Sequence, residues 1–155
     1  DNPSPGNHKG GITTLEEKSL GCVQKGGDSV ICDVISYADE LKINGLNLLW
    51  GPGNDIVSTT NLSCSGVQMI LFTTGRGTSL GSFVPTVKIS SNTPLFNKKK
   101  NWIDFNAGEL INGKDINKLT DELFELVIDI ANGKKTKNEI NNYREIAIFK
   151  QGVTL

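Results

Sequence analysis

LNLLWGPGNDIVSTTNLSCSGVQMILFTT (residues 46–74) is the part of this 155-residue sequence that decides its fold. Residues 46–50 and 67–74 are nearly continuous apolar runs, and residues 55–66 between them have the length of a helix that ends at Gly66. A strand, a helix and a second strand of these lengths form a βαβ unit, and strands without polar alternation are typical of a sheet covered on both faces. We therefore predict the α/β class, with a mostly parallel sheet and helices on both faces of it.

Further strands and one clear helix are predicted towards the C-terminus. Residues 85–90 have the pattern of a third strand, and residues 101–106 and 144–150 are two more strand candidates. The strongest periodicity in the chain predicts a helix with Asp115 as its N-cap and Gly133 at its end. The apolar face of this helix consists of Ile116, Leu119, Leu123, Val127 and Ile130.

The N-terminal part contains a capped helix and one ambiguous segment. Thr13, followed three residues later by Glu16, is a capping-box pattern, and Gly26 and Gly27 should end the helix that begins there. Residues 29–37 are apolar enough to form either a strand or a short helix.

Composition and charge exclude several classes of function. With 37% hydrophobic and 21% charged residues and no visible linker, residues 1–155 are interpreted as a single domain. A net charge of -1 gives no electrostatic case for binding nucleic acid or an anionic membrane, and no apolar run is long enough to span a bilayer. Three cysteines without paired spacing are typical of a reducing compartment, so we expect a cytoplasmic location.

A glycine-rich loop, TTGRGTSLG (residues 73–81), follows the most apolar predicted strand. Open parallel sheets bind ligands beyond the carboxyl ends of their strands. Glycines let backbone N–H groups approach an anion, and the planar guanidinium of Arg76 matches a carboxylate or a phosphate. The alternative is a tight turn in which Arg76 only faces solvent. The glycine spacing does not match the dinucleotide-binding fingerprint, and the position after a buried strand favours a ligand loop over a simple turn.

Two adjacent acids, Glu16 and Glu17, precede Lys18 at the start of the first predicted helix. One interpretation is capping, because an acid in the first turn stabilises the unpaired N–H groups of the helix. The other is chemistry, since one acid suffices for a cap and leaves the second carboxylate, with Lys18, for metal binding or proton transfer. Both interpretations stay open on the sequence alone.

Eight blocks that follow one another along the whole chain carry a resemblance to a known family. They are NPSPGN, GGITTLEEKSLGC, GLNLL, PGND, LFTTGRGT, FVPTVKISSN, WIDFNAG and REIAIFKQGVTL. Together they resemble the C-terminal part of the bacterial altronate and galactarate dehydratase family, and the last blocks are more similar to its altronate branch. One departure is Ser79, where the family loop usually has a proline. The family's enzymes are much longer, so the resemblance implies that their N-terminal and middle regions are absent here.

The resemblance implies a Rossmann-like catalytic region of a hydro-lyase that dehydrates D-altronate to 2-dehydro-3-deoxy-D-gluconate in hexuronate breakdown. It implies a sugar acid as substrate, a divalent metal ion (Fe²⁺ or Mn²⁺) as cofactor, and allows a homodimer of the full-length enzyme. At the matching positions, Arg76, Gly77 and Thr78 are expected to bind the substrate carboxylate or hydroxyl groups, and Asn7 to line the opening loop.

The same resemblance assigns expected roles to the acids. Glu16 or Glu17 is a candidate metal ligand or catalytic acid or base, and Lys18 is a candidate catalytic residue beside them. The activity implied by the resemblance belongs to the full-length enzyme. We therefore expect the isolated chain to be inactive. Two rival interpretations are a non-catalytic α/β module that binds a small anion or mediates assembly, and a structural fragment whose ligand-binding residues lie in the missing regions.

Overall fold

The computed structural model describes residues 2–150, and the contacts within it divide the chain into two units. The N-terminal unit consists of Asp1–Ile35 and Leu41–Leu48, and the C-terminal unit of Ser36–Glu40 and Leu49–Leu155. Each unit is described by itself below. The interpretation of residues 1–155 as one domain depends on how the two units are arranged, and it stays a prediction.

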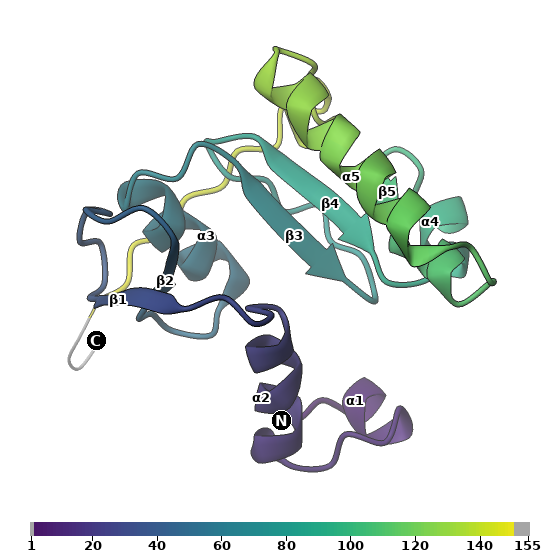
Figure 1. The fold of residues 1–155 in the computed structure, drawn as a ribbon, viewed down its shortest axis with the longest axis horizontal. Coiled ribbons are helices and arrows are strands. Elements are labelled where there is room, and N and C mark those ends of the chain that lie inside the picture. Colours follow the sequence, from purple (N-terminus) through teal and green to yellow (C-terminus); the bar gives the residue numbers. More distant parts are fainter. Residues whose placement is uncertain (1, 151–155) are drawn as a thin grey trace. The chain divides into compact units, whose positions relative to one another are not determined.

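A three-stranded parallel sheet forms the centre of the C-terminal unit (Figure 1). Its strands are β3 (Ile70–Thr74), β4 (Thr86–Ser90) and β5 (Phe105–Asn106), in the order β3-β4-β5. Ile70 pairs with Thr86, and Ile89 pairs with Phe105. Each of the strands predicted at 67–74, 85–90 and 101–106 is therefore present, although β5 is shorter than predicted.

The long helix α5 (Ile116–Ala131) covers the apolar face of this sheet. Val87 and Ile89 of β4 form a buried cluster with Ile130 of α5, and partly buried apolar side chains surround it. The Asp115 side chain accepts a hydrogen bond from the backbone N–H of Lys118 (3.1 Å), which confirms it as the N-cap. The periodicity that predicted this helix is thus the pattern of its buried face.

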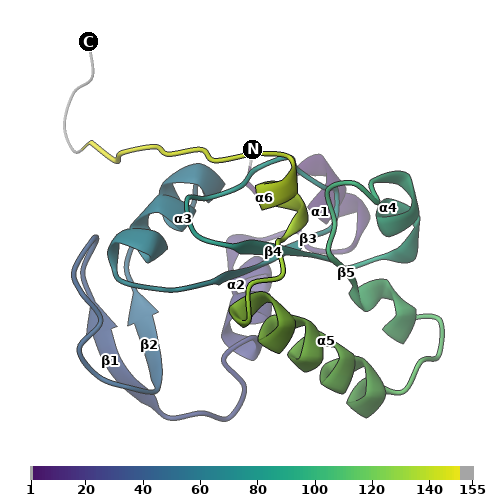
Figure 2. The ribbon, with the colours of Figure 1, turned by 90° about the horizontal axis from the view of Figure 1, so that it is seen from above.

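The opposite face of β4 is polar and equally buried. Thr86, Lys88 and Ser90 alternate with the apolar residues of the strand, and each is at most 1% exposed. The short helix α6 (Lys137–Ile140) contacts β4 from this side. Figure 2 shows α5 and α6 on opposite sides of the sheet. The α/β class, with a parallel sheet and helices on both of its faces, is confirmed.

The predicted βαβ unit is wrong in one respect. Helix α3 (Asp55–Cys64) forms as expected, but β2 (Leu46–Leu49) pairs with β1 (Ile31–Ile35) in a separate two-stranded sheet. A short segment with three leucines specifies a strand but not its partner, and β2 is only partly buried. Residues 75–85, a segment without a helix, connect β3 to β4 instead.

The predicted C-terminal strand at 144–150 is also wrong. Alternate residues of this segment are partly buried, as in a strand, but it joins no sheet in the described chain. The N–H groups of Glu145, Ala147 and Phe149 donate to Gly81 O (2.8 Å), Thr60 Oγ1 (3.1 Å) and the Tyr37 hydroxyl (3.1 Å). Single acceptors on loops and side chains satisfy these donors in place of a neighbouring strand. The segment is therefore extended but belongs to no sheet in the described chain.

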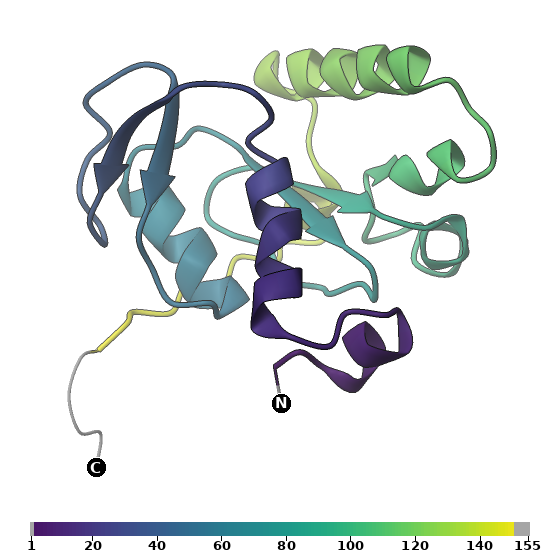
Figure 3. The same ribbon diagram turned by 60° about the horizontal axis from the view of Figure 1, so that its bottom comes forward.

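The N-terminal unit contains α1 (Pro5–Lys9), α2 (Leu15–Gln24) and the sheet of β1 and β2 (Figure 3). The predicted helix near residue 13 is confirmed as α2, and the ambiguous segment 29–37 contains strand β1. The short elements α1, α4 (Thr93–Lys98), α6 and a 3-10 turn at Ala107–Leu110 were not predicted. None of the helices between residues 2 and 150 is both long and apolar enough to cross a membrane.

Candidate functional site

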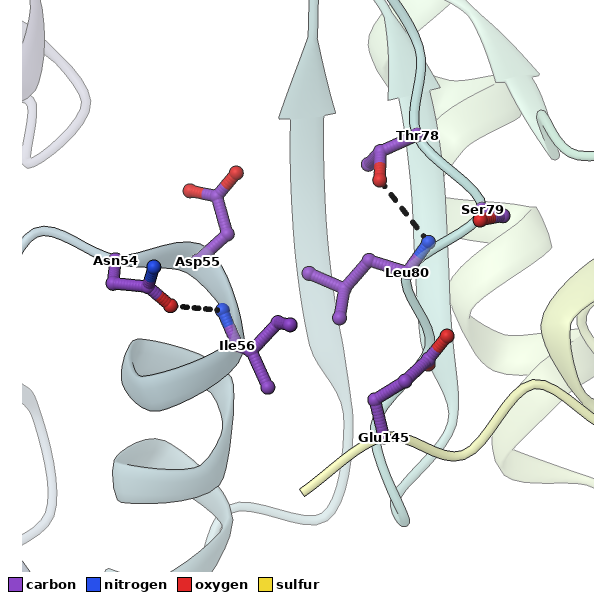
Figure 4. Close-up of a pocket in the computed structure, with 7 residues that line it drawn as sticks. All are labelled: Asn54, Asp55, Ile56, Thr78, Ser79, Leu80 and Glu145. Carbon is purple, nitrogen blue, oxygen red and sulfur yellow. Dashed lines mark hydrogen bonds between the residues drawn. The ribbon is translucent and has the colours of Figure 1, made fainter. Parts of the chain in front are cut away.

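A cleft of about 330 Å³ lies beside the loop that follows β3, within the C-terminal unit. Three segments that are distant in sequence line it, as Figure 4 shows: the beginning of α3, the loop after β3 and the extended C-terminal segment. The lining residues are Asn54, Asp55, Ile56, Thr78, Ser79, Leu80 and Glu145. The loop that follows β3 therefore borders a cavity, and in the α/β pattern such loops are the expected place for a ligand.

The beginning of α3 supplies one wall of the cleft. Asn54 is its N-cap, and its side-chain oxygen accepts hydrogen bonds from the N–H groups of Ile56 (3.1 Å) and Val57 (3.3 Å). Asp55 follows in the first turn with an exposed carboxylate. Ile56 faces Leu80 of the opposite wall (Figure 4). The cleft thus combines apolar sides with acceptor oxygens that can bind the hydroxyl groups of a small polar ligand.

Residues 78–80 of the loop after β3 form the opposite wall. Gly77 has φ +83°, and a Cβ there would lie 2.8 Å from Leu95, so the turn requires glycine. Its N–H donates to Thr74 Oγ1 (3.0 Å), and Thr78 Oγ1 accepts from the N–H of Leu80 (3.2 Å). These bonds hold the turn in one conformation at the end of β3.

Glu145 closes the cleft from the C-terminal segment. One of its carboxylate oxygens accepts a hydrogen bond from the N–H of Gly81 (2.7 Å), and its own N–H donates to Gly81 O (2.8 Å). Gly81 is packed tightly, because a Cβ there would lie 2.3 Å from Tyr143 O and 3.0 Å from the Asn138 Cβ. A carboxylate from residue 145 is therefore fixed against the loop at residue 81.

Of the three loop residues predicted to bind substrate, the structure places Thr78 on the cleft, whereas Gly77 shapes the turn. Arg76 is exposed, and its guanidinium has no hydrogen bond or ion-pair partner among residues 2–150. It lies two residues from Thr78 and is available to an anionic ligand. Binding by these three residues stays a prediction.

The two adjacent acids lie in the N-terminal unit, and the predicted capping box is wrong by one residue. The N-cap of α2 is Thr14, and its partner is Glu17 rather than Glu16. Glu17 Oε2 accepts from Thr13 N (2.7 Å), Thr13 Oγ1 (3.0 Å) and Thr14 N (3.2 Å). These bonds, first of all that from Thr13 N–H, lower the pKa of Glu17. Two threonines and two acids in succession fit the pattern in either register, and Glu17 is the acid that caps.

Other predicted residues of this unit also have local structural partners. Asn7 is the corresponding cap partner in α1, where its side-chain oxygen accepts from Ser4 N (3.1 Å) and Ser4 Oγ (3.0 Å). Lys18 Nζ donates to Asn2 Oδ1 (2.6 Å). The exposed Glu16 carboxylate has no such partner within the described chain, so Glu16 is the acid that remains available for chemistry.

The predicted divalent metal does not fit the pair of acids. Three hydrogen bonds go to Glu17 Oε2, and together with Glu16 the pair offers at most two carboxylates where Fe²⁺ or Mn²⁺ requires several ligands. Between residues 2 and 150, no three side chains of Asp, Glu, His or Cys are grouped as a metal site requires. The metal dependence stays a prediction for the full-length protein.

Lys88 is the most unusual residue that sequence reasoning missed. It is 0% exposed, and its ammonium group donates to Thr78 O and to Asn138 Oδ1 (3.1 Å). Burial lowers the pKa of Lys88 to about 8, although the carboxylates of Asp104 and Glu145 act in the opposite direction. Burial likewise raises the pKa of Asp104. The available signal was a lysine inside the apolar strand pattern at 85–90.

The matches to known proteins extend over nearly the whole chain. Residues 1–154 match the family model described as D-galactarate/Altronate dehydratase, C-terminal. The chain belongs to this family. Within the family, it is 59% identical to an altronate dehydratase of Escherichia coli (strain K12) and 51% identical to one of Bacillus subtilis (strain 168), each over 100% of the chain. It is 37% identical to the galactarate dehydratase (L-threo-forming) of Escherichia coli (strain K12) over 96% of the chain.

As a family member, the chain is short. It spans 31% of the length of the two altronate dehydratases and 29% of the galactarate dehydratase. The resemblance that the sequence blocks indicated is confirmed, including the greater similarity to the altronate branch.

Replacement of each acid should have a different result. Glu17→Ala removes the acceptor of three hydrogen bonds and should lower the melting temperature, whereas Glu16→Ala should leave it nearly unchanged. Because the pKa of Glu17 is lower in the folded state, its stabilisation is present above its ordinary value of 4.5 and is lost as the pH falls below it. The difference in stability between the parent and Glu17→Ala should therefore shrink as the pH falls from 7 through about 4.

Thermal unfolding of the two variants and the parent across this pH range measures these differences. Equal melting temperatures for Glu17→Ala and the parent at neutral pH would contradict the assigned cap. If Glu16 has a role in chemistry, Glu16→Ala in the full-length protein should lose activity while it keeps its stability.

Proposed function

We propose that this chain is the C-terminal part of a hydro-lyase that dehydrates D-altronate to 2-dehydro-3-deoxy-D-gluconate. One observation carries the proposal: the identity to altronate dehydratases, 59% and 51%, extends over the entire chain and exceeds the 37% to galactarate dehydratase. The cleft supports the proposal because it combines hydroxyl, carboxylate and apolar groups beside the loop that follows a parallel strand.

The reaction makes specific demands on the residues of the site. A base removes the proton from C2, beside the carboxylate, and an enediolate forms. The hydroxyl on C3 then leaves as water after it receives a proton from an acid, and the resulting enol converts to the 2-keto product. Negative charge on the carboxylate oxygens increases as the C2 proton departs. Donors that face these oxygens therefore stabilise the transition state more than the substrate.

Arg76 and Thr78 are the residues that we assign to the carboxylate end of the substrate. The exposed guanidinium of Arg76 has two parallel N–H groups that fit the two oxygens of a carboxylate. Thr78 has its hydroxyl on the cleft and can bind a substrate hydroxyl. Gly77 allows the turn between them.

Asp55 and Glu145 are additional acid or base candidates, because their carboxylates line the same cleft. Glu145 is oriented by the N–H of Gly81, which leaves its second oxygen for a substrate proton. Glu16 and Lys18 of the N-terminal unit remain candidates for the same tasks from the sequence motif. Which of these groups transfers each proton is a matter for kinetics of single variants.

Other parts of the proposal are carried by the resemblance. We include Fe²⁺ or Mn²⁺ as the cofactor, a cytoplasmic location and a homodimer of the full-length enzyme. The remaining regions of the polypeptide are expected to complete the site, because the chain spans 31% of the altronate dehydratases that it matches.

A panel assay of the full-length protein tests the proposed function. Purified protein with Fe²⁺ or Mn²⁺ and a reductant is mixed with D-altronate, galactarate and other hexonates, and the 2-keto product is followed. Altronate should give the highest kcat/KM, and this chain alone should give no measurable turnover. A preference for another sugar acid would contradict the substrate, and turnover by the isolated chain at the full-length rate would contradict the composite site.

A further inference from the structure

A lysine under the ligand loop is buried at a considerable energetic cost. Removal of an ammonium group from water is energetically unfavourable, so a fully buried lysine is retained only where fixed acceptors surround it. Lys88 is 0% exposed, whereas its neighbours Val87 and Ile89 point into the apolar cluster on the other face of β4. An apolar residue at position 88 would avoid this cost, which makes the partners of Lys88 informative.

The acceptors of Lys88 connect the loop to α6. The Lys88 ammonium group donates to the carbonyl oxygen of Thr78 and to the side-chain oxygen of Asn138. Asn138 is 2% exposed, and its amide group donates in turn to Thr86 O (3.1 Å). All three contacts lie within the C-terminal unit, and they attach the middle of the loop to the polar face of the sheet.

Helix α6, which carries Asn138, is itself attached to β4. The Asp104 carboxylate accepts from the N–H groups of Lys88 and Lys137, both at 2.8 Å, so it links β4 to the first residue of α6. The N-cap Thr136 and its partner Glu139 complete that helix end. Asn138 is therefore presented to Lys88 by a helix that is itself tied to β4.

We propose that Lys88 is a positioning residue that, through the carbonyl of Thr78 and with Asn138 as its support, holds the loop carrying Arg76 in the geometry that binds the substrate carboxylate. The inference rests on the proposed function. Lys88 does not touch the substrate, because its ammonium group lies beneath the loop and its side chain is closed to solvent. At pH 7 the lysine is mostly charged, since its pKa of about 8 is above that value.

Kinetics of the full-length protein test the effect on the reaction. Lys88→Met has a similar length but no donor, and should lower kcat on altronate by roughly ten- to hundredfold, as expected for a small displacement of a substrate-binding group. Lys88→Gln keeps a neutral N–H donor and should recover part of this loss. Lys114→Met is the matched control, since Lys114 forms ion pairs only with Glu109 and Glu122 at the surface, and it should behave as the parent.

Hydrogen exchange of the same variants tests the anchor independently of activity. Backbone amides of residues 75–81 should exchange at least roughly tenfold faster in Lys88→Met, with α5 unchanged, because local opening becomes easier when the loop loses its attachment. Unchanged exchange in this loop, unchanged kcat in Lys88→Met, or equal kcat losses in Lys88→Met and Lys88→Gln would each overturn the proposal. A parent that dehydrates no sugar acid would refute the proposed function, while the exchange would still decide whether Lys88 anchors the loop.

Discussion

Arg76→Lys in the full-length protein is expected to fold normally and to lose roughly ten- to hundredfold in kcat/KM on altronate. A lysine keeps the positive charge but cannot form two parallel hydrogen bonds with a carboxylate, and one charge-assisted hydrogen bond contributes about 1.5–3 kcal/mol. The fold should be unaffected, because Arg76 is exposed and has no hydrogen bond or ion pair within residues 2–150. If the guanidinium acts mainly in the transition state, kcat should fall more than KM rises.

Steady-state kinetics and thermal unfolding of Arg76→Lys measure these effects. Arg144→Lys is the matched control, since Arg144 is also exposed but lies outside the glycine-rich loop 73–81, and it should keep the parental kinetics. Parental kcat/KM in Arg76→Lys would mean that Arg76 is a surface residue and that the substrate carboxylate binds elsewhere.

The second large effect is expected from Gly81→Ala. The new Cβ would lie 2.3 Å from Tyr143 O, and this contact is with backbone, which cannot move aside as a flexible side chain can. The C-terminal segment must then separate from the loop, and both hydrogen bonds between Gly81 and Glu145 weaken. We expect a loss of about 1–3 kcal/mol in the free energy of unfolding, or more where the segment detaches. The activity of the full-length protein should fall as well, because Glu145 loses its orientation in the cleft.

Denaturant unfolding of the chain compares Gly81→Ala with Gly21→Ala. A Cβ at Gly21, which lies within α2, has no other atom within 4 Å, and alanine favours a helix over glycine by about 1 kcal/mol. Gly21→Ala should therefore be neutral or stabilising. A Gly81→Ala variant as stable as the parent would show that the C-terminal segment is not packed against the loop as described.

The parts of the fold that sequence patterns predicted are those that local physics determines. Helix α5 has a long apolar face and an N-cap, Asp115, so its position follows from the order of residues alone. The strand pattern at 85–90 and the loop after β3 were predicted for the same reason. Where the pattern was short, it failed: the leucines of residues 46–49 predicted β2 but not its partner β1. Two threonines and two acids follow one another at the start of α2. The sequence therefore could not decide between the pairs Thr13–Glu16 and Thr14–Glu17 as the capping box.

The parts of the site that were missed depend on contacts between distant residues. Glu145 meets Gly81 across 64 residues, and Lys88 meets Asn138 across 50. Neither sequence separation can be read from a local pattern, and residues 144–150 were predicted as a strand where the structure has an extended segment with single partners. A buried lysine is equally hard to predict, since lysine is among the residues that are most often exposed. The loop with Arg76 and Thr78 was predictable because glycine spacing and position after a strand are both local signals.

The most direct test of the account is a crystal structure of the full-length protein with a 3-deoxy analogue of altronate. Because the analogue has no hydroxyl group on C3, it cannot lose water and should remain bound. The account predicts that its carboxylate is paired with the Arg76 guanidinium, that one of its hydroxyl groups is in contact with Thr78, and that its carbon chain lies in the cleft beside Asp55 and Glu145. An analogue bound elsewhere, with residues 75–81 free of contact, would contradict the assignment of this cleft as the substrate site.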